Sequence, residues 1–290
     1  MNKKTTYIAP TSLDEALKIL NNNMGETKVI AGGTDLIPRM RSGMATPKRL
    51  LDIRKLSLSS IKLQGDFICI GAGATHTAIM ESELLSVYCP ILRKVAYKIA
   101  GPPIRNRGTV GGNLVSASPA ADLAPPLLIN DAEVVLSSFR AERVVPLVDF
   151  FTGPGETVIT HKEILTEIRI PVSTETAATC FIKLGKRNAM TISVVHSAVR
   201  FSLDSKGKIA SSRIALGSVA PTPVRAVKAE EALEGELPGM ELFQNVSALA
   251  SEEVSPISDN RASAGYRLEM VYVLTKRSLL TAFSDYKKVI

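Results

Sequence analysis

Aromatic residues are scarce in this chain of 290 residues, which has no Trp, 8 Phe and 6 Tyr. Proteins that bind single-stranded nucleic acid interleave such rings with clustered Lys and Arg. Here the basic residues are scattered in ones and twos. The formal net charge of +7 therefore favours an acidic ligand or an acidic protein partner, and we expect no nucleic acid.

Cysteine is also scarce. Cys69, Cys89 and Cys180 are far apart and fit no zinc, iron–sulfur or CxxC spacing. The three histidines form no metal-binding motif. We therefore predict no metal site in this chain. An odd number of cysteines, with no apolar leader after Met1, favours the reducing cytoplasm.

Long hydrophobic runs and several catalytic motifs are absent. Uncharged stretches such as Thr109 to Ala121 are shorter than the ~20 residues that a membrane-spanning helix needs. No GxxxxGK[ST] loop occurs, which excludes a P-loop NTPase, and no GxSxG motif indicates a hydrolase. We expect a protein with no membrane span and with no catalytic side chain of its own.

What is present is a mixed helix and strand pattern with ordinary proportions of apolar (45%) and charged (22%) residues. Hydrophobic periodicity predicts strands over 28–30, 50–53, 67–70, 133–136, 143–147 and 164–170, and helices over 12–20 and 83–100. Beyond the linker 171–174 the pattern predicts antiparallel strands over 179–184, 193–203 and 208–219, then helices over 225–234, 240–253 and 261–283. These observations predict two α+β domains with a boundary near residue 172.

Two glycine-rich loops are the most informative features. Ala31–Asp35 follows a predicted strand, and Thr109–Asn113 overlaps the end of a window, residues 101–112, that holds four glycines. Consecutive backbone N–H groups can form a concavity that binds phosphate or pyrophosphate. Either loop alone is better explained by a turn, whereas the two together favour a shared ligand. Residues 71–76 begin like a dinucleotide fingerprint but have His76 in place of its third glycine.

Together, the two loops resemble the paired FAD-pyrophosphate loops of the flavin subunits of molybdenum hydroxylases. That family includes xanthine dehydrogenase, carbon monoxide dehydrogenase and related aromatic hydroxylases. The resemblance continues in family order through residues 99–106, 118–122, 163–165, 183–187 and 220–223, so it covers nearly the whole chain. It implies a two-lobed FAD-binding domain of the vanillyl-alcohol-oxidase type over 1–172, with lobes at about 1–55 and 56–172. A small C-terminal α+β domain, with an antiparallel sheet and helices, would follow over 175–290.

The resemblance also implies a role for each matched residue. The residues that would wrap the pyrophosphate through their main chain are Lys28, Val29, Ile30, Ala31, Gly32, Gly33, Thr34, Asp35 and Leu36. Those that would close its second side are Thr109, Gly111, Gly112 and Asn113. Ser116 and Asp122 match positions that hold the phosphate and ribose portion, and Ile164, Leu165 and Lys183 match positions near the adenine or the isoalloxazine ring. A lysine there would stabilise negative charge on reduced flavin.

The function that the resemblance implies is electron transfer. FAD would accept electrons from the [2Fe-2S] clusters of an iron–sulfur subunit and pass them to NAD or another acceptor, while a molybdopterin-containing large subunit hydroxylates the substrate. The family suggests a heterotrimer that dimerises to a hexamer. Thr34-Asp35 replaces the His-Ser pair that the carbon monoxide enzymes usually carry, which places the chain nearer the purine and aromatic branches. The three dispersed cysteines exclude the extra iron–sulfur cluster of the benzoyl-CoA branch.

Two alternatives remain from the residues alone. A self-sufficient FAD-dependent oxidase or dehydrogenase would need acid or base groups placed over the flavin ring. A nucleotide-binding interaction protein would bind the ligand without turnover. His76 is also open to two interpretations, because it follows a strand and a glycine turn. It could face the flavin cleft, or it could have a structural or capping role.

Overall fold

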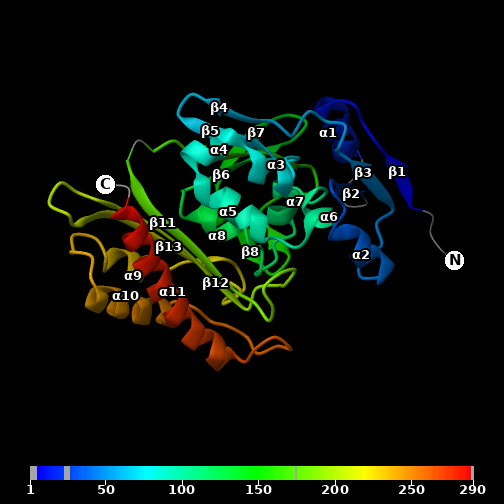
Figure 1. The fold of residues 1–290 in the computed structure, drawn as a ribbon. Coiled ribbons are helices and arrows are strands. Elements are labelled where there is room, and N and C mark those ends of the chain that lie inside the picture. Colours follow the sequence, from blue (N-terminus) through cyan, green and yellow to red (C-terminus); the bar gives the residue numbers. More distant parts are fainter. Residues whose placement is uncertain (1–4, 23–26, 174, 289–290) are drawn as a thin grey trace.

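The computed structural model describes residues 5–22, 27–173 and 175–288. At one end of the molecule lies a parallel sheet in the order β1-β3-β2, made of β1 (Thr6–Ile8), β3 (Arg49–Asp52) and β2 (Thr27–Ile30) (Figure 1). Helix α1 (Leu13–Asn22) buries its Ala16, Leu17 and Leu20 face against this sheet. Helix α2 (Leu36–Arg41) follows β2 after a five-residue loop, 31–35.

The central sheet is antiparallel, with the order β4-β5-β10-β6-β7. Its strands are β4 (Ile61–Gln64), β5 (Phe67–Gly71), β10 (Ile164–Pro171), β6 (Glu133–Ser137) and β7 (Glu142–Pro146). One face of β5, β10 and β6 shares a core with short helices, which are α3 (His76–Glu81), α4 (Glu83–Tyr88), α5 (Pro90–Lys98), α7 (Val110–Val115) and α8 (Ala124–Leu128). The remaining short elements are α6 (Pro102–Arg105), η1 (Leu147–Asp149), β8 (Phe151–Gly153) and β9 (Glu156–Thr157).

The prediction of a single helix over 83–100 is wrong in one respect, because this segment forms two helices, α4 and α5. The chain breaks at Cys89, whose φ of −148° and ψ of 61° are not helical, and α5 begins at Pro90. Proline lacks the N–H that a continuous helix would need and is tolerated only in the first turn. The apolar spacing survives the break, since Leu85, Ile91, Leu92 and Val95 all belong to the central core.

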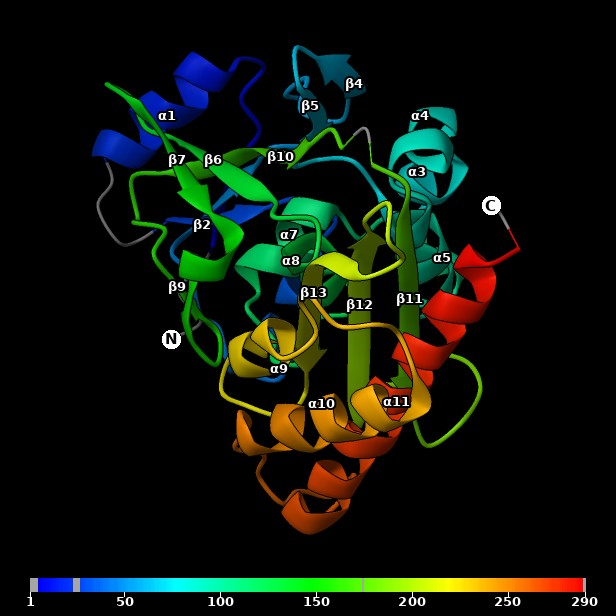
Figure 2. The ribbon, with the colours of Figure 1, turned by 90° about the vertical axis from the view of Figure 1, so that its left-hand side faces the viewer.

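The C-terminal sheet, in the order β11-β12-β13-β14, is antiparallel as predicted. Its strands are β11 (Ala177–Leu184), β12 (Val195–Leu203), β13 (Ile209–Gly217) and β14 (Val224–Arg225). Residues alternate between its faces: Ala198 packs with the central core, whereas Val199 and Phe201 pack with the C-terminal helices. Those helices are α9 (Val227–Glu231), α10 (Met240–Glu252) and α11 (Ala264–Tyr286), and Figure 2 shows α10 and α11 beside the long strands.

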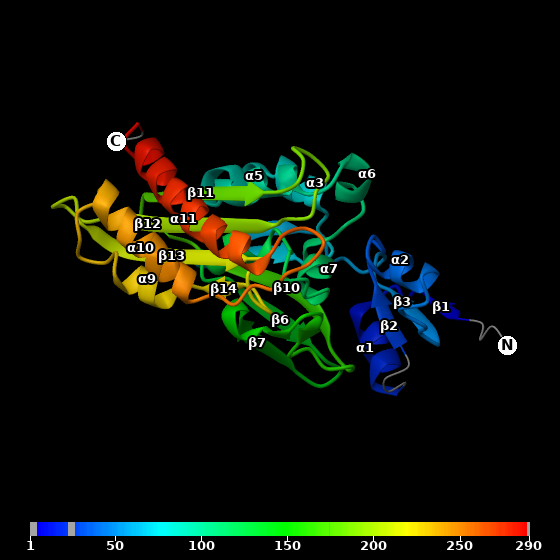
Figure 3. The ribbon, with the colours of Figure 1, turned by 90° about the horizontal axis from the view of Figure 1, so that it is seen from below.

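This arrangement confirms the expected α+β fold and leaves the N-terminal sheet at one end, with the C-terminal helices at the other (Figure 3). Ile164 of β10 belongs to the small core of the N-terminal sheet, which joins the two regions. Both glycine-rich loops lie at this junction. Among the described residues, no helix is long and apolar enough to cross a membrane.

Candidate functional site

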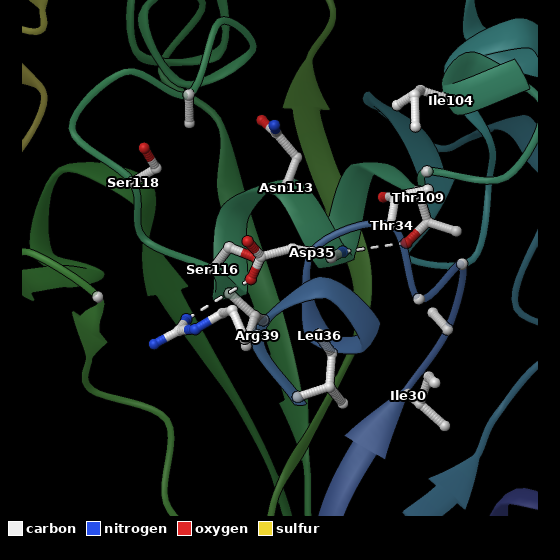
Figure 4. A pocket seen from close by; sticks show the side chains of 18 of the residues that line it. Ile30, Thr34, Asp35, Leu36, Arg39, Ile104, Thr109, Asn113, Ser116 and Ser118 are labelled. Carbon is white, nitrogen blue, oxygen red and sulfur yellow. Dashed lines mark hydrogen bonds and ion pairs between the residues drawn. The ribbon is translucent and has the colours of Figure 1, made fainter. Parts of the chain in front are cut away.

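A cleft of about 1060 Å³ lies where the two glycine-rich loops meet, and Figure 4 shows side chains that line it. The predicted site residues that line it are Lys28, Val29, Ile30, Ala31, Gly32, Gly33, Thr34, Asp35, Leu36, Thr109, Gly112, Asn113, Ser116 and Asp122. Residues to which the sequence patterns assign no role line it too, among them Ile104 of the matched segment 99–106, Met190, Ile192 and Arg261. The last three come from loops of the C-terminal region, so no local motif could have revealed them.

The first loop carries a row of unpaired backbone donors. Within the described residues, the N–H groups of Gly32, Gly33, Thr34 and Asp35 donate to no backbone or side-chain acceptor. Gly33 has a φ of +73°, a conformation that favours glycine because it has no Cβ. Unpaired N–H groups in a concave loop attract the oxygens of an anion such as pyrophosphate.

Gly32 also has a role in packing. A Cβ on Gly32 would lie 1.8 Å from the carbonyl oxygen of Arg107, which is far too close, so only glycine fits at this position. The missing side chain therefore allows the first loop to pack directly on the backbone that leads into the second loop. Gly111 is similar, since its Cβ would lie 2.6 Å from the Cβ of Ala72.

The second loop does not present a comparable row of free amides. The N–H of Val110 donates to the Ala74 carbonyl, that of Gly111 to the Ala72 carbonyl, and that of Gly112 to the Thr109 Oγ1 at 3.1 Å. Thr109 thus caps α7. This loop instead offers side chains, and the Oδ1 of Asn113 is buried with no partner among the described residues. A bound ligand that donates a hydrogen bond would satisfy that oxygen.

Asp35 ties the two loops together. Its Oδ2 accepts a hydrogen bond from Ser116 Oγ at 3.4 Å and lies 3.5 Å from the Arg39 guanidinium (Figure 4). The contact joins residues 81 positions apart in the chain. The carboxylate therefore orders the loop in this structure.

The ionised side chains that line the cleft are mostly basic. They are Lys28, Arg39, Lys48 and Arg261, against Asp35 and Asp122. Arg261 is held by Asp259, whose Oδ2 lies 2.8 Å from its NH1, and Asp259 is held in turn by the buried Arg267. This excess of positive charge suits a ligand that carries phosphates.

Asp122 lies at the centre of a buried polar cluster. Its Oδ2 is 2.5 Å from Lys183 Nζ, and its Oδ1 accepts from Ser193 Oγ at 2.6 Å and lies 3.2 Å from His196 Nδ1. Burial disfavours the charge on Asp122, but the hydrogen bond and charge of His196 and the charge of Lys183 outweigh it, so its pKa lies below the ordinary value. Lys183 lines neither the cleft nor the adjoining pocket and contacts the cleft wall through Asp122.

A smaller pocket of about 310 Å³ shares Lys28, Val29, Thr109 and Gly112 with the cleft. The remaining predicted residues, Gly111, Ile164 and Leu165, line this pocket. Its walls are largely apolar, and the Oγ1 of Thr27 is buried there without a partner among the described residues. A flat heterocycle with polar edges, such as adenine, has the matching chemistry.

Two family models match the chain. One, described as the FAD binding domain in molybdopterin dehydrogenase, matches residues 3–173, and the other, the CO dehydrogenase flavoprotein C-terminal domain, matches residues 181–282. The chain belongs to the FAD-binding subunits of the molybdenum hydroxylases. It is thus a subunit of an oxidoreductase with FAD as its cofactor, as the resemblance implied.

Relatives of this family match over nearly the full length. The putative xanthine dehydrogenase FAD-binding subunit of Escherichia coli is 34% identical over 96% of this chain and 95% of its own length. The carbon monoxide dehydrogenase medium chain of Afipia carboxidovorans is 33% identical over 94% of each chain. A solved structure of carbon monoxide dehydrogenase from Hydrogenophaga pseudoflava matches with a TM-score of 0.94 and 32% identity, covering 98% of this chain and 99% of that one.

The residues present fit FAD. The row of free N–H groups in the first loop suits its pyrophosphate, the excess of basic side chains suits its charge, and the two adjoining pockets suit its two aromatic ends. Asn113 adds an unpartnered oxygen inside the same lining. The second loop offers side chains and close packing to the same cleft, rather than a row of free amides.

Proposed function

We propose that this chain is the electron-transfer subunit of a molybdenum hydroxylase in the cytoplasm. It receives electrons from the [2Fe-2S] clusters of an iron–sulfur subunit and delivers them to NAD or another acceptor. A molybdopterin-containing large subunit carries out the substrate chemistry, and the three chains form a heterotrimer that pairs to a hexamer. The row of free N–H groups at Gly32–Asp35, in a cleft shaped for a dinucleotide, is the observation that supports this proposal most strongly.

Bound FAD supplies the redox chemistry, because its isoalloxazine can exchange one or two electrons. The chain holds the cofactor. The first loop takes the pyrophosphate on its N–H groups, and the pocket beside Ile164 and Leu165 takes the adenine. The riboflavin half then lies in the larger cleft, where Ile104 and Ile192 provide apolar contacts and exclude water.

Asp122 and Lys183 form an ion pair at the wall of this cleft. The pair is nearly shielded from water, with side-chain exposures of 10% and 6%. The two opposite charges compensate each other, so the pair would hold the cleft wall in place rather than give it a positive field. Asp122 lines the cleft and would face the cofactor, while the Lys183 ammonium behind it fixes the position of the carboxylate.

The proposal is tested by native purification of the tagged chain from its own host, with an absorbance spectrum and metal analysis. We expect a flavin band at about 450 nm together with iron and molybdenum in the same complex. Flavin on a single, active polypeptide would support a self-sufficient flavoenzyme instead. Purified complex without any flavin would contradict both.

The division of FAD between two pockets makes a second prediction. ADP should bind to the flavin-free chain and compete with FAD, because it carries both the adenine and the pyrophosphate. FMN should bind at least about tenfold more weakly than FAD, since it lacks the adenine half, a loss of about 1.4 kcal/mol or more. Isothermal titration of the three ligands measures this. Equal affinity for FMN and FAD would show that the smaller pocket does not hold the adenine.

A further inference from the structure

His76 is a buried residue in the cleft lining to which the proposed function assigns no role. It is the first residue of α3, and the Thr75 Oγ1 that caps this helix accepts from the N–H of Ala78 at 3.1 Å. The backbone N–H of His76 donates to the Gly108 carbonyl at 3.0 Å. The position of the imidazole is therefore fixed both by the helix and by the segment that leads into the second glycine-rich loop.

The imidazole has no protein partner. Its residue is only 3% exposed, yet in the part of the chain that the structure describes neither ring nitrogen makes a hydrogen bond. Nδ1 is fully buried, whereas Nε2 keeps some access to the cleft that His76 lines. Nε2 also lies 3.2 Å from the place where a Cβ of Gly108 would be. The glycine at 108 thus leaves room for the ring at the cleft wall.

The protonation state of this ring follows from its surroundings. Burial lowers the pKa of His76 to about 4, with Asp122 opposing and Arg105 adding to the effect, so the ring is neutral near pH 7. A neutral imidazole carries one N–H donor. A proton on Nδ1 would be a buried donor without an acceptor, which is costly, whereas a proton on Nε2 can reach the cleft. The surroundings therefore favour the tautomer that presents Nε2–H to whatever occupies the cleft.

We infer that His76 is a positioning residue that donates a hydrogen bond from Nε2 to the riboflavin half of bound FAD. The inference rests on the proposed function, because it needs FAD in the cleft. The riboflavin half is the target because His76 lines the larger cleft only, beside Ile104 and Gly108, and not the pocket proposed for the adenine. The bond fixes the depth at which the flavin enters the cleft.

The experiment compares FAD and ADP binding to the full chain after flavin removal. His76→Phe keeps a ring without a donor, and we expect FAD to bind about three- to tenfold more weakly while ADP affinity stays unchanged. His76→Gln, which can place an amide donor near the same point, should recover most of the loss. Thr77→Val is the matched control, since Thr77 lies on the same helix and bonds Asn106 without lining the cleft.

The outcomes separate this inference from the proposed function. If the wild-type chain binds no FAD, the proposed function fails. If it binds FAD and His76→Phe binds it equally well, or loses ADP to the same extent, only the inference fails. A measurement without mutation covers a variant that does not fold: ¹⁵N-histidine NMR of the wild-type chain. FAD, but not ADP, should shift the Nε2–H signal of His76 and slow its exchange, and no shift would overturn the inference.

Discussion

Gly32→Ala is expected to weaken FAD binding at least about hundredfold, a loss of about 2.7 kcal/mol, in a chain that still folds. The new Cβ would lie 1.8 Å from the Arg107 carbonyl oxygen, so the first loop must move away from that backbone. The loop carries the N–H groups of Gly32, Gly33, Thr34 and Asp35, and their shared direction is lost when it moves. Each hydrogen bond to a charged group is worth about 1.5–3 kcal/mol, so misalignment of two accounts for the effect.

Flavin absorbance per mole of purified chain, followed by FAD titration, measures this loss. Gly265→Ala is the control, because a Cβ there meets no atom within 4 Å and should leave FAD binding unchanged. Gly33→Ala should have a smaller effect, since its φ of +73° costs an alanine about 1 kcal/mol without a backbone collision. Stoichiometric flavin in purified Gly32→Ala would show that the loop tolerates the shift and that its packing on Arg107 does not hold the cofactor site together.

The sequence was sufficient to find the two glycine-rich loops but not to explain each glycine. A run such as Ala31–Asp35 after an apolar strand is a local pattern, and local patterns are what a single sequence displays. The close approach of the Gly32 backbone to the Arg107 carbonyl joins residues that are distant in the chain, so it becomes visible only in the folded protein. The same limit applies to Gly111 and Ala72.

The cleft wall contributed by the C-terminal region shows the same limit more strongly. Met190, Ile192 and Arg261 belong to two loops that no motif marks, and they reach the cleft because the C-terminal sheet packs on the central core. The resemblance did indicate Asp122 and Lys183, but not that they contact each other. Pro90 itself indicates a break in the helix, but the apolar residues keep a helical spacing on both sides of it, and that spacing predicted one continuous helix.

Asp122→Asn should destabilise the chain by about 3–5 kcal/mol, because it leaves the buried Lys183 ammonium without its counter-charge. The asparagine Oδ1 can still accept from Ser193, so the loss measures the charge more than the hydrogen bond. Lys183→Met combined with Asp122→Asn should regain most of that stability, since neither charge is then buried alone. Asp14→Asn, which removes an exposed ion pair with Lys18, is the control and should leave the unfolding midpoint unchanged.

The pH dependence of stability gives an independent test of the same cluster. The folded-state pKa of Asp122 lies below the ordinary 3.8, so the unfolded chain takes up this proton more readily than the folded one. The contribution of the carboxylate is therefore complete above about pH 4 and is lost as the pH falls through the lower, folded-state value. Urea unfolding at pH 7 and below pH 4 should show a smaller acid loss in Asp122→Asn than in the wild type. Equal losses in both would mean that Asp122 is not held ionised by Lys183 and His196.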